Sequence, residues 1–526
     1  MNRSLGDQLQ ELLAGAGIGV TPCSAQCPQT FVSLALASES WAEAAHLARE
    51  HGLRLVALWA DQDAEGAYTL YATYAQSGAG YALLNTTLQG ETMEFPSMVS
   101  HYIAAARMER VIHDMYGLVP TGHPDLRPWI SHGHWLPGNG PLQQTFTAER
   151  AGETPAGEYP FLELESEGVY QIPVGPVHAG IIEPGHFRFL AVGEQILNME
   201  ARLGYVHKGI ERAMVGQTAQ DAVRLAGRVS GDATVAHAWA FCAAAESAAQ
   251  IEIPLRARQL RAVLCERERM ANHIGDIGAV CNDAAWSFMH LQCQRLREDM
   301  ARLHERVFGH RLLMDRVVPG GLACELAEDD IPALLEQTHK LVDEMARLFL
   351  LYEEHTPIRE RVVDSGNISQ KDSLDLGLVG YVARAAAVRI DARYDAAYSP
   401  YDVTTIEPVS CHGGDVSARL WVRFKEIESS AQLIEQLLMN LDDGPSCRGW
   451  RDPEAGRCGF AVIESWRGEI AAWVRFATAG RVGRYYVRDP SMMNWLGLEL
   501  VVRSVPVPDF PLNNKSFNCS YSGHDL

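Results

Sequence analysis

The sequence lacks an uninterrupted apolar run of the roughly 18 residues that a membrane-spanning helix needs. Its richest apolar stretch, residues 334–352, is broken by polar and charged side chains, among them Glu336, His339, Lys340, Asp343 and Arg347. Residues 1–13 carry Asp7 and Glu11 and lack the apolar segment of a signal peptide. We therefore expect a cytoplasmic protein without a membrane span.

Basic residues are in deficit. The chain of 526 residues has 45 Lys and Arg against 66 Asp and Glu, which gives a formal net charge of −21. A protein that binds the phosphate backbone of DNA or RNA uses clustered positive charge, so this balance argues against a nucleic-acid partner.

Cysteine is sparse and scattered, with 11 residues and no dense framework, so we expect mostly free thiols. Cys23 and Cys27 form the one close pair, and no second pair completes a zinc site. The sequence therefore predicts no metal held by this chain, and it leaves the role of this pair open.

Periodicity divides the chain into two units and a linker. Residues 1–136 alternate helical and extended patterns, with a helix predicted over 42–51 and strands over 53–59 and 67–74, which indicates an α+β domain. Residues 137–164 shift to Gly, Pro, Thr and Glu without periodicity, as linkers do.

Residues 165–526 are mainly helical in pattern. Apolar residues recur at spacings of three and four over 254–278, and Asp329 and Asp330 before Pro332 mark the start of a second long helix. We expect another helix over 416–440 and short strands over 170–174 and 459–486. The second unit is therefore expected to be a helical domain with short β-strands.

Three segments of this unit combine uncommon residues at defined spacing. They are RLGYVHKGIER at 202–212, RVSGDATVAH at 228–237, and the tail DFPLNNKSFNCSYSGHDL at 509–526. These segments resemble the signature regions shared by the large subunits of nickel-iron hydrogenases and the quinone-site subunit of respiratory complex I.

In that family a working hydrogenase carries Arg-x-Cys-Gly-x-Cys-x-x-x-His and, near its C-terminus, Asp-Pro-Cys-x-x-Cys; the four thiolates hold the metals. The resemblance matches Arg228, Gly231 and His237, but Ser230 and Ala233 stand at the first two thiol positions.

In the tail, Cys519 and Ser522 fall on the second pair of thiol positions, with Phe517 and Asn518 in place of Asp-Pro. Nickel and low-spin iron in such a site require soft, deprotonated sulfur, which a hydroxyl or a methyl group cannot replace. One thiol of four predicts that nickel-iron catalysis is lost. The family's accessory metal ligands would correspond to Glu211 and to Asp525, beside His524.

The complex I branch of the family matches further segments. GHPDLR at 122–127 resembles the small subunit that is fused to the quinone-site subunit in some bacteria, and GPVH at 175–178 resembles the opening of the large subunit. ESWRGE at 464–469, with Arg467 and Glu469, resembles another of its segments. The tyrosine that binds the quinone headgroup in complex I corresponds to Gly231, which puts quinone reduction in question.

The resemblance implies a set of candidate site residues. His178, Glu211, Arg228, Asp232 and His237 are the candidates for catalysis or proton transfer. Simpler interpretations remain open for four of them. Arg228 and Asp232 stand at ion-pair spacing on a helix, Glu211 lies four residues after His207, and His237 begins an apolar helix where it could pack in the core. By composition alone, Arg467 reads as part of a surface or hairpin charge cluster.

Two functions remain open. In one, the chain is a peripheral-arm subunit of a membrane-bound, ion-translocating oxidoreductase complex that is complex I-like (NADH:quinone oxidoreductase) or hydrogenase-related; it is not itself a hydrogenase and passes electrons from an iron-sulfur subunit to a quinone or unknown acceptor. In the other, it is a non-catalytic scaffold or coupling subunit of such a complex. Either implies an iron-sulfur small subunit, a ferredoxin-like subunit and antiporter-like membrane subunits as partners, which hold the chain at the inner face of the membrane.

Overall fold

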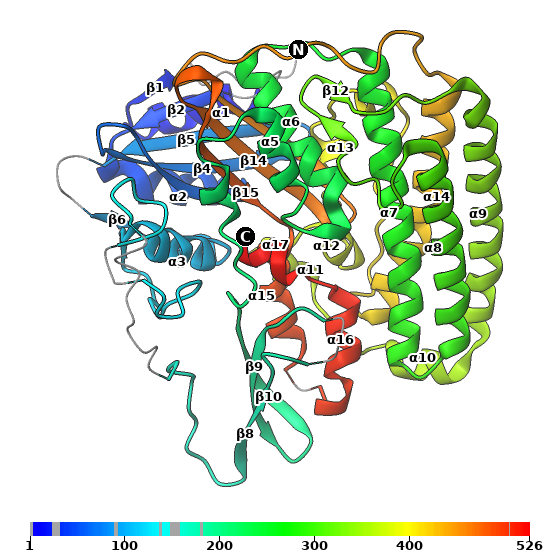
Figure 1. Cartoon of the computed structure of the whole chain (residues 1–526). Helices are drawn as coiled ribbons and strands as arrows, with labels where there is room; N and C mark the ends of the chain where they lie inside the picture. The colour runs from blue at the N-terminus through cyan, green and yellow to red at the C-terminus, as the bar shows by residue number, and fades with distance from the viewer. Residues whose placement is uncertain are drawn as a thin grey trace.

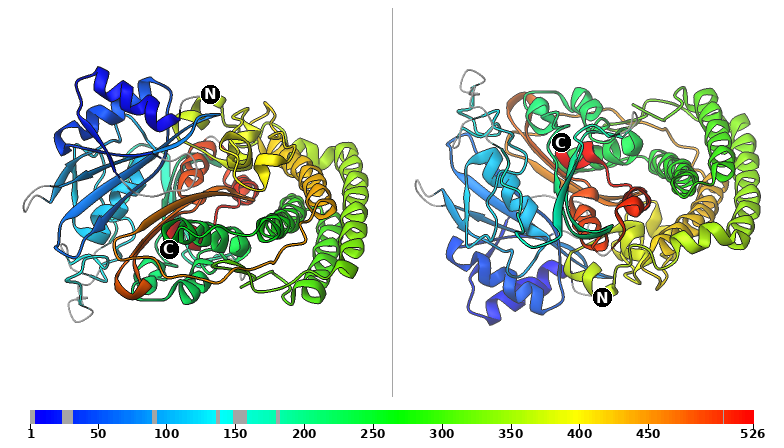
Figure 2. Two further views of the ribbon diagram at one scale, coloured as in Figure 1. Left: turned by 90° about the horizontal axis from the view of Figure 1, so that it is seen from above. Right: turned by 90° about the horizontal axis from the view of Figure 1, so that it is seen from below.

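The computed structural model describes residues 4–23, 32–88, 93–135, 139–147, 158–178, 182–503 and 505–526. An N-terminal α+β unit lies against a larger, mainly helical unit, and the C-terminal segment runs through the middle of the molecule (Figures 1 and 2). The predicted fold class is therefore confirmed. Cys27 lies outside the described residues, so the role of Cys23 and Cys27, which the sequence leaves open, has no structural description.

The N-terminal unit is a five-stranded sheet with helices packed on it. The strand order is β1-β2-β5-β4-β3, in which β2 and β5 are parallel and the other neighbours antiparallel. Its elements are α1 (Leu5–Gly15), β1 (Val20–Cys23), β2 (Val32–Leu36), α2 (Trp41–Glu50), β3 (Arg54–Gln62), β4 (Tyr68–Gln76), β5 (Gly80–Thr87), β6 (Glu94–Pro96), α3 (Ala105–Tyr116) and β7 (Val119–Thr121). The predicted helix at 42–51 and both predicted strands are present.

Strand β3 is almost wholly apolar because both of its faces are buried. Leu55 and Leu58 face the core of the N-terminal unit, whereas Trp59 faces the larger unit. The Trp59 ring stacks on Tyr486 with centroids 4.7 Å apart and lies 5.8 Å from the Trp473 ring. The two units therefore share a continuous aromatic core.

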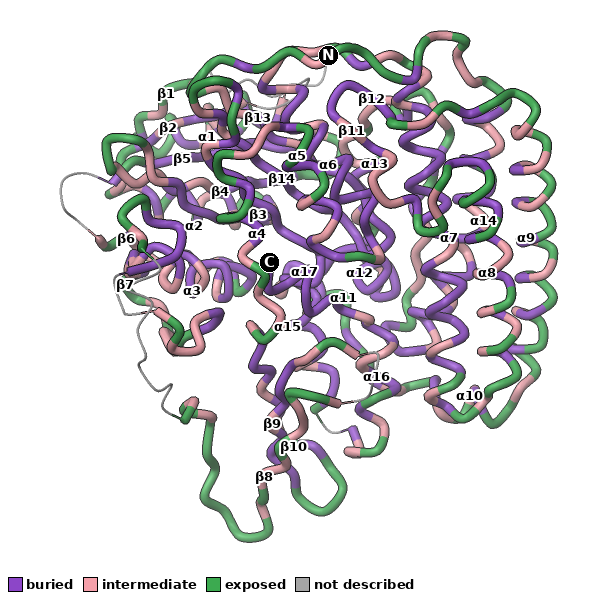
Figure 3. Tube along the Cα trace, viewed as in Figure 1, coloured by how far each residue is buried: buried purple, intermediate pink, exposed green. Residues whose placement is uncertain are grey.

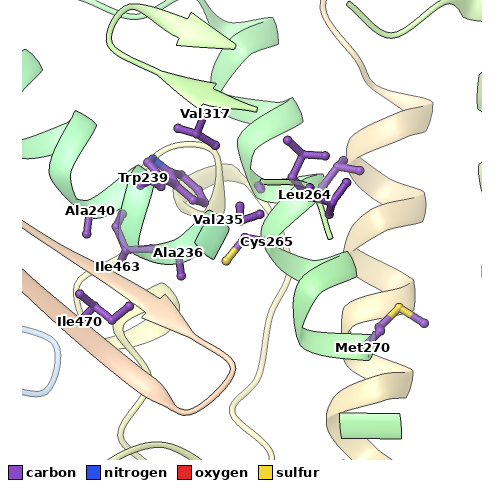
Figure 4. Close-up of a cluster of buried hydrophobic side chains, with 14 of the residues drawn as sticks. Val235, Ala236, Trp239, Ala240, Leu264, Cys265, Met270, Val317, Ile463 and Ile470 are labelled. Carbon is purple, nitrogen blue, oxygen red and sulfur yellow. The ribbon is translucent and has the colours of Figure 1, made fainter. Parts of the chain in front are cut away.

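The larger unit contains a second sheet, covered by a helix that is apolar on all sides. Strands β13 (Cys458–Ser465), β14 (Gly468–Phe476) and β15 (Val482–Arg488) pair antiparallel, and α6 (Thr234–Ala249) lies on them. Small residues allow this close packing: a Cβ at Gly459 would lie 1.9 Å from the Ala244 carbonyl oxygen. Figure 4 shows side chains of α6, α7 and this sheet meeting in the core.

Four long helices form a bundle at the far side of the molecule (Figure 1). They are α7 (Leu255–Asp283), α8 (Ser287–Phe308), α9 (Ile331–Glu354) and α14 (Val416–Met439), which confirms the three helices predicted there. Helix α9 buries Leu334, Thr338, Leu341, Met345, Leu348 and Tyr352, a single stripe at spacings of three and four, as an outer helix does.

The remaining elements are short. The helices are α4 (Ile210–Met214), α5 (Ala219–Ala226), α10 (Thr356–Val362), α11 (Gln370–Asp375), α12 (Gly380–Ala385), α13 (Ala392–Asp395), α15 (Ser491–Val501), α16 (Phe510–Phe517) and α17 (Tyr521–Asp525). The strands are β8 (Val169–Val174), β9 (His186–Val192), β10 (Gln195–Arg202), β11 (Val317–Val318) and β12 (Gly321–Leu322). The predicted strands at 170–174 and 459–486 are present.

Burial is deepest where the segments with unusual motifs meet. Figure 3 shows α17 and its surroundings buried, whereas the chain leading into β8 is largely exposed and β8 itself is mostly half-buried. Among the described residues, none of the helices combines the length and apolarity that a membrane crossing requires. Residues 139–147 pack on the N-terminal unit: the backbone N–H of Leu142 donates to the Met115 carbonyl oxygen at 3.1 Å.

Candidate functional site

Two of the unusual segments, almost 300 positions apart in the chain, meet through serine hydroxyls. Ser230 Oγ lies 2.8 Å from Ser520 Oγ, which lies 3.4 Å from Ser522 Oγ. Ser230 precedes a single 3-10 turn, η3 (Gly231–Ala233), and Ser520 caps α17 by accepting from the Gly523 backbone N–H at 2.9 Å. All three serines are buried. Two of the four positions matched to metal thiols, Ser230 and Ser522, are therefore linked through Ser520.

Arg467 connects a third segment to the same place. Its Nη1 and Nη2 donate to Asp232 Oδ1 and Oδ2 at 2.7 and 2.5 Å, and its Nε donates to the Asn518 carbonyl oxygen at 2.7 Å. Burial alone would raise the pKa of Asp232, but Arg467 lowers it below its ordinary value. Asp232 is thus a carboxylate held by a guanidinium, and Ser230 Oγ donates to it at 2.7 Å.

The hairpin turn between β13 and β14 places Arg467 there. Gly468 adopts φ +133°, a conformation that favours glycine, and it leads the chain back into β14. The interpretation of Arg467 as part of a surface or hairpin cluster is wrong as to exposure, because the side chains of Arg467, Glu464 and Glu469 are all buried.

Arg228 is not the partner of Asp232. Its guanidinium pairs bidentately with Asp315 at 2.7 and 2.8 Å, and its side chain is 38 % exposed. The predicted local ion pair between Arg228 and Asp232 is therefore wrong. The 3-10 turn after Ser230 breaks the helical spacing on which that prediction rested.

His237 is fully buried at the start of α6 and shares a hydrogen bond with Asp489, Nε2 to Oδ2, at 2.9 Å. Burial would raise the pKa of Asp489, but the hydrogen bond from His237 brings it far below its ordinary value. Asp489 also accepts from the Ser491 backbone N–H, and Ser491 Oγ accepts from the Ser520 backbone N–H at 2.8 Å. His237 is therefore a paired core histidine that is connected to the serine cluster through Asp489 and Ser491.

Glu469 pairs with an arginine of the N-terminal unit, and Glu211 pairs with an arginine that itself donates to Tyr116 of that unit. Glu211 Oε1 accepts from Arg484 Nη1 at 3.0 Å, so Arg484 and not His207 forms its ion pair; burial raises the pKa of Glu211. Glu469 accepts from Arg54 Nη2 at 2.9 Å and Arg488 Nη2 at 2.8 Å. Both carboxylates hold elements together.

His178 approaches the cluster from the loop before β9. Its ring stacks on Phe187 at 5.3 Å between centroids and lies 6.3 Å from the Tyr521 ring, and burial lowers the pKa of His178. The neighbouring Glu183 accepts from the Ser522 backbone N–H at 3.0 Å. Of the accessory positions, Asp525 accepts from His524 at 2.8 Å and from the Val206 backbone N–H at 3.1 Å.

The donor set at the four thiol positions does not fit a nickel-iron centre. Ser230 and Ser522 offer hydroxyls, Ala233 a buried methyl group, and Cys519 one thiol whose pKa burial raises to about 12. Soft metals in such a centre need thiolates. Among the described residues, no three His, Cys, Asp or Glu side chains are arranged to hold a metal ion.

A cavity of about 410 Å³ opens beside Asp232, between η3, α7, α8 and the segment 311–313. Its wall includes Glu268, Asn272 and Arg297, none of which the sequence motifs singled out. In the described part of the chain, Asp232 is a candidate site residue that lines this cavity. His178, Glu211 and His237 do not line it.

Three residues of the site are missing from the predicted set. Ser520 and Asp489 lie beside motif positions but match no motif residue. For Glu268 the sequence does contain an indication, because this charged residue lies between Leu264 and Asn272 on helix α7, where it is buried. A charged residue within an apolar stripe indicates a buried partner or a cavity.

Comparison with known proteins gives three family matches. Residues 283–454 match the 49 Kd subunit of respiratory-chain NADH dehydrogenase, residues 34–151 its 30 Kd subunit, and residues 208–275 the nickel-dependent hydrogenases.

Among curated proteins, formate hydrogenlyase subunit 5 of Escherichia coli (strain K12) is 32% identical over 443 residues, covering 82% of this chain and 77% of that protein. Hydrogenase-4 component G of the same strain is 31% identical, covering 88% of this chain and 81% of that protein. The C/D subunit of the NADH-quinone oxidoreductase of Bacteroides fragilis is 26% identical over 454 residues, covering 82% of this chain and 85% of that protein.

A subunit in the structure of the membrane-bound sulfane sulfur reductase, an archaeal respiratory membrane complex, has the same fold: the TM-score is 0.65 at 22% identity, covering 69% of this chain and all of that chain. With the identities and coverage above, the chain belongs to the family of fused large subunits shared by membrane-bound hydrogenases and respiratory NADH dehydrogenase.

Proposed function

We propose that the chain is a peripheral-arm subunit of a membrane-bound, ion-translocating oxidoreductase complex and does not activate hydrogen itself. The observation that carries this proposal is the donor set at the four thiol positions: two hydroxyls, one methyl group and one thiol. Its relatives are named as subunits of hydrogenases and NADH-quinone oxidoreductases, which supports the assignment to such a complex.

The partners proposed for it are an iron-sulfur small subunit, a ferredoxin-like subunit and antiporter-like membrane subunits, with the chain itself binding no metal. In this arrangement electrons reach the surroundings of His178 and Ser522 from a partner's iron-sulfur cluster and pass to a quinone or another small acceptor. The lowered pKa of His178 keeps its imidazole neutral near pH 7, so one ring nitrogen can donate and the other can accept a hydrogen bond there.

A second candidate is a coupling subunit without redox chemistry. The packing of the cluster supports it, because Arg467, Asp232 and the three serines fill the place with side chains that hydrogen-bond to one another. A subunit of this kind transmits movement between its partners without receiving electrons.

Purification of the tagged full-length chain in mild detergent tests the proposal. We expect it to bring along iron-sulfur and antiporter-like membrane proteins, with nickel far below one atom per chain by elemental analysis. Stoichiometric nickel, hydrogen evolution, or isolation as a lone monomer would contradict it.

His178→Ala in the purified complex separates the two candidates. If electrons pass near His178, the variant loses quinone reduction and ion transport together. A coupling subunit predicts that electron transfer between the other subunits continues in this variant. Glu454→Gln, at an exposed site on the same chain, is the control and should change neither activity.

A further inference from the structure

The cavity beside Asp232 carries a positive charge that no neighbour neutralises. Among the described residues, Arg297 on its wall has no hydrogen-bond acceptor and no carboxylate in ion-pair range. The Arg297 side chain lies along helix α7 at Gly275, where a Cβ would be 3.4 Å from Arg297 Cδ and 3.5 Å from Nη1. Its guanidinium is therefore positioned by packing and free to bind.

The other charges around the cavity are already paired. Asp232 is held by Arg467 at 2.5 and 2.7 Å. Glu298 accepts from Arg311 at 2.5 Å and from Arg302 at 2.9 Å. His304 Nε2 accepts from Arg267 at 2.8 Å, and burial with that neighbouring cation holds the pKa of His304 well below its ordinary value, so it is neutral.

Glu268, which also lines the cavity, adds no negative charge near neutral pH. It accepts from the backbone N–H groups of Val235 and Ala236 at 2.8 and 3.2 Å. Burial outweighs these bonds and, with the nearby Asp232, raises the pKa of Glu268 to about 8. The carboxylates of Asp232 and Glu298 therefore already have arginine partners, and Arg297 is left without a counter-charge.

The rest of the wall is apolar or neutral. Ala271, Ala301, Leu312 and Leu313 provide apolar surface, and the Gln294 amide has no partner among the described residues. The volume of about 410 Å³ lies within the range of small-molecule sites.

We propose that this cavity binds a small monoanion with an apolar body, of the class of carboxylic acids, whose carboxylate pairs with Arg297. The planar guanidinium suits a carboxylate because two parallel N–H groups can donate to its two oxygens. The apolar body lies against the alanine and leucine side chains. This site does not depend on the proposed function, because it is built from side chains outside the four thiol positions.

Isothermal titration calorimetry of the purified full-length chain with benzoate tests the proposal, and benzamide serves as its neutral isostere. We expect benzoate to bind and benzamide to bind at least about tenfold more weakly. Arg297→Met should weaken benzoate binding by at least about tenfold. Arg306→Met removes a charge from the exposed face of α8 and should leave binding unchanged.

Three outcomes would overturn the proposal. The first is the absence of benzoate binding to the unmodified chain at about 10 mM ligand. The second is equal binding of benzoate and benzamide, or an undiminished affinity in Arg297→Met with its unfolding midpoint unchanged. The third is binding to the isolated chain that disappears in the purified complex, because the cavity would then be a contact for a partner subunit.

Discussion

The ion pair between Arg467 and Asp232 ties three distant segments together with one side chain. Arg467 is 4 % exposed, whereas Asp232 is 35 % exposed toward the cavity. Loss of Asp232 would therefore leave a buried guanidinium without a counter-charge, which costs more free energy than leaving the partly exposed carboxylate unpaired.

We expect Asp232→Asn to lower the free energy of unfolding by about 3 kcal/mol, because it leaves a buried cation unpaired. Arg467→Met should lower it by about 2 kcal/mol, and the double variant by less than the sum. Urea denaturation of the full chain measures these values. Arg295→Ala, which breaks the exposed pair with Glu344, should change the free energy by less than about 1 kcal/mol.

Glu268 gives the protein a specific dependence of stability on pH. Its pKa is about 8 in the folded chain and near 4.5 when unfolded. The folded state therefore holds the proton more tightly, so this contribution is complete at low pH and is lost as the pH rises toward about 8.

Glu268→Gln cannot lose a proton, so its stability relative to the unmodified chain should rise by more than about 1 kcal/mol between about pH 5 and pH 8. Denaturation at several pH values measures this difference. Glu305→Gln, at an exposed site on α8, should follow the unmodified chain throughout. A flat difference for Glu268→Gln would mean that the carboxyl is ionised across this range.

Among the elements, helix α9 offers a direct test of the amphipathic pattern. Leu341 is 2 % exposed and packs against the bundle, whereas Leu350 is 62 % exposed on the same helix. We expect Leu341→Ala to cost about 2–5 kcal/mol of unfolding free energy, and Leu350→Ala to stay within about 0.5 kcal/mol. Equal effects would mean that α9 has a second buried face in the isolated chain.

The long helices were predictable from sequence because their signal is local. An outer helix such as α9 repeats its apolar residues every three or four positions, and Asp329 with Asp330 marks its start. Strand β3 was also visible as an apolar run, but the reason for its double burial, the contact of Trp59 with Tyr486, spans more than 400 positions. No local pattern contains that contact.

The site was predictable only in part, for the same reason. The resemblance indicated Ser230, Ser522, Cys519 and Arg467, which the fold brings together. The partner of Asp232 could not be inferred from sequence. The closest basic residue at helical spacing is Arg228, whereas the actual partner, Arg467, is 235 positions away. Asp489 and Ser520 depend on the same long-range packing.

At the scale of the whole molecule, the two units are held by buried charges as well as by aromatic rings. Glu469 is fully buried and accepts from Arg54 of the N-terminal unit and from Arg488 of its own sheet. Asp61 and Arg475 form a second pair across the same boundary, with Oδ2 and Nε 2.6 Å apart.

We expect Glu469→Gln to loosen the N-terminal unit, because two arginines then lose their counter-charge. Amide hydrogen exchange in β3 and β4 should become faster, with little change in α8 and α9 on the far side. Glu454→Gln, at an exposed site, should leave the exchange pattern as it is. Uniform acceleration across the chain would instead indicate global destabilisation.

The pairing of Arg467 with Asp232 also limits how this protein could be redesigned to carry metal. Introducing cysteine at Ser230, Ala233 and Ser522 one at a time would leave the guanidinium and carboxylate paired with each other, next to position 230. Each single change would remove hydroxyl hydrogen bonds or enlarge a packed side chain and would supply too few thiols to bind anything in return. The replacements would have to be made together, with residue 232 changed as well, before the first gain in metal affinity could be measured.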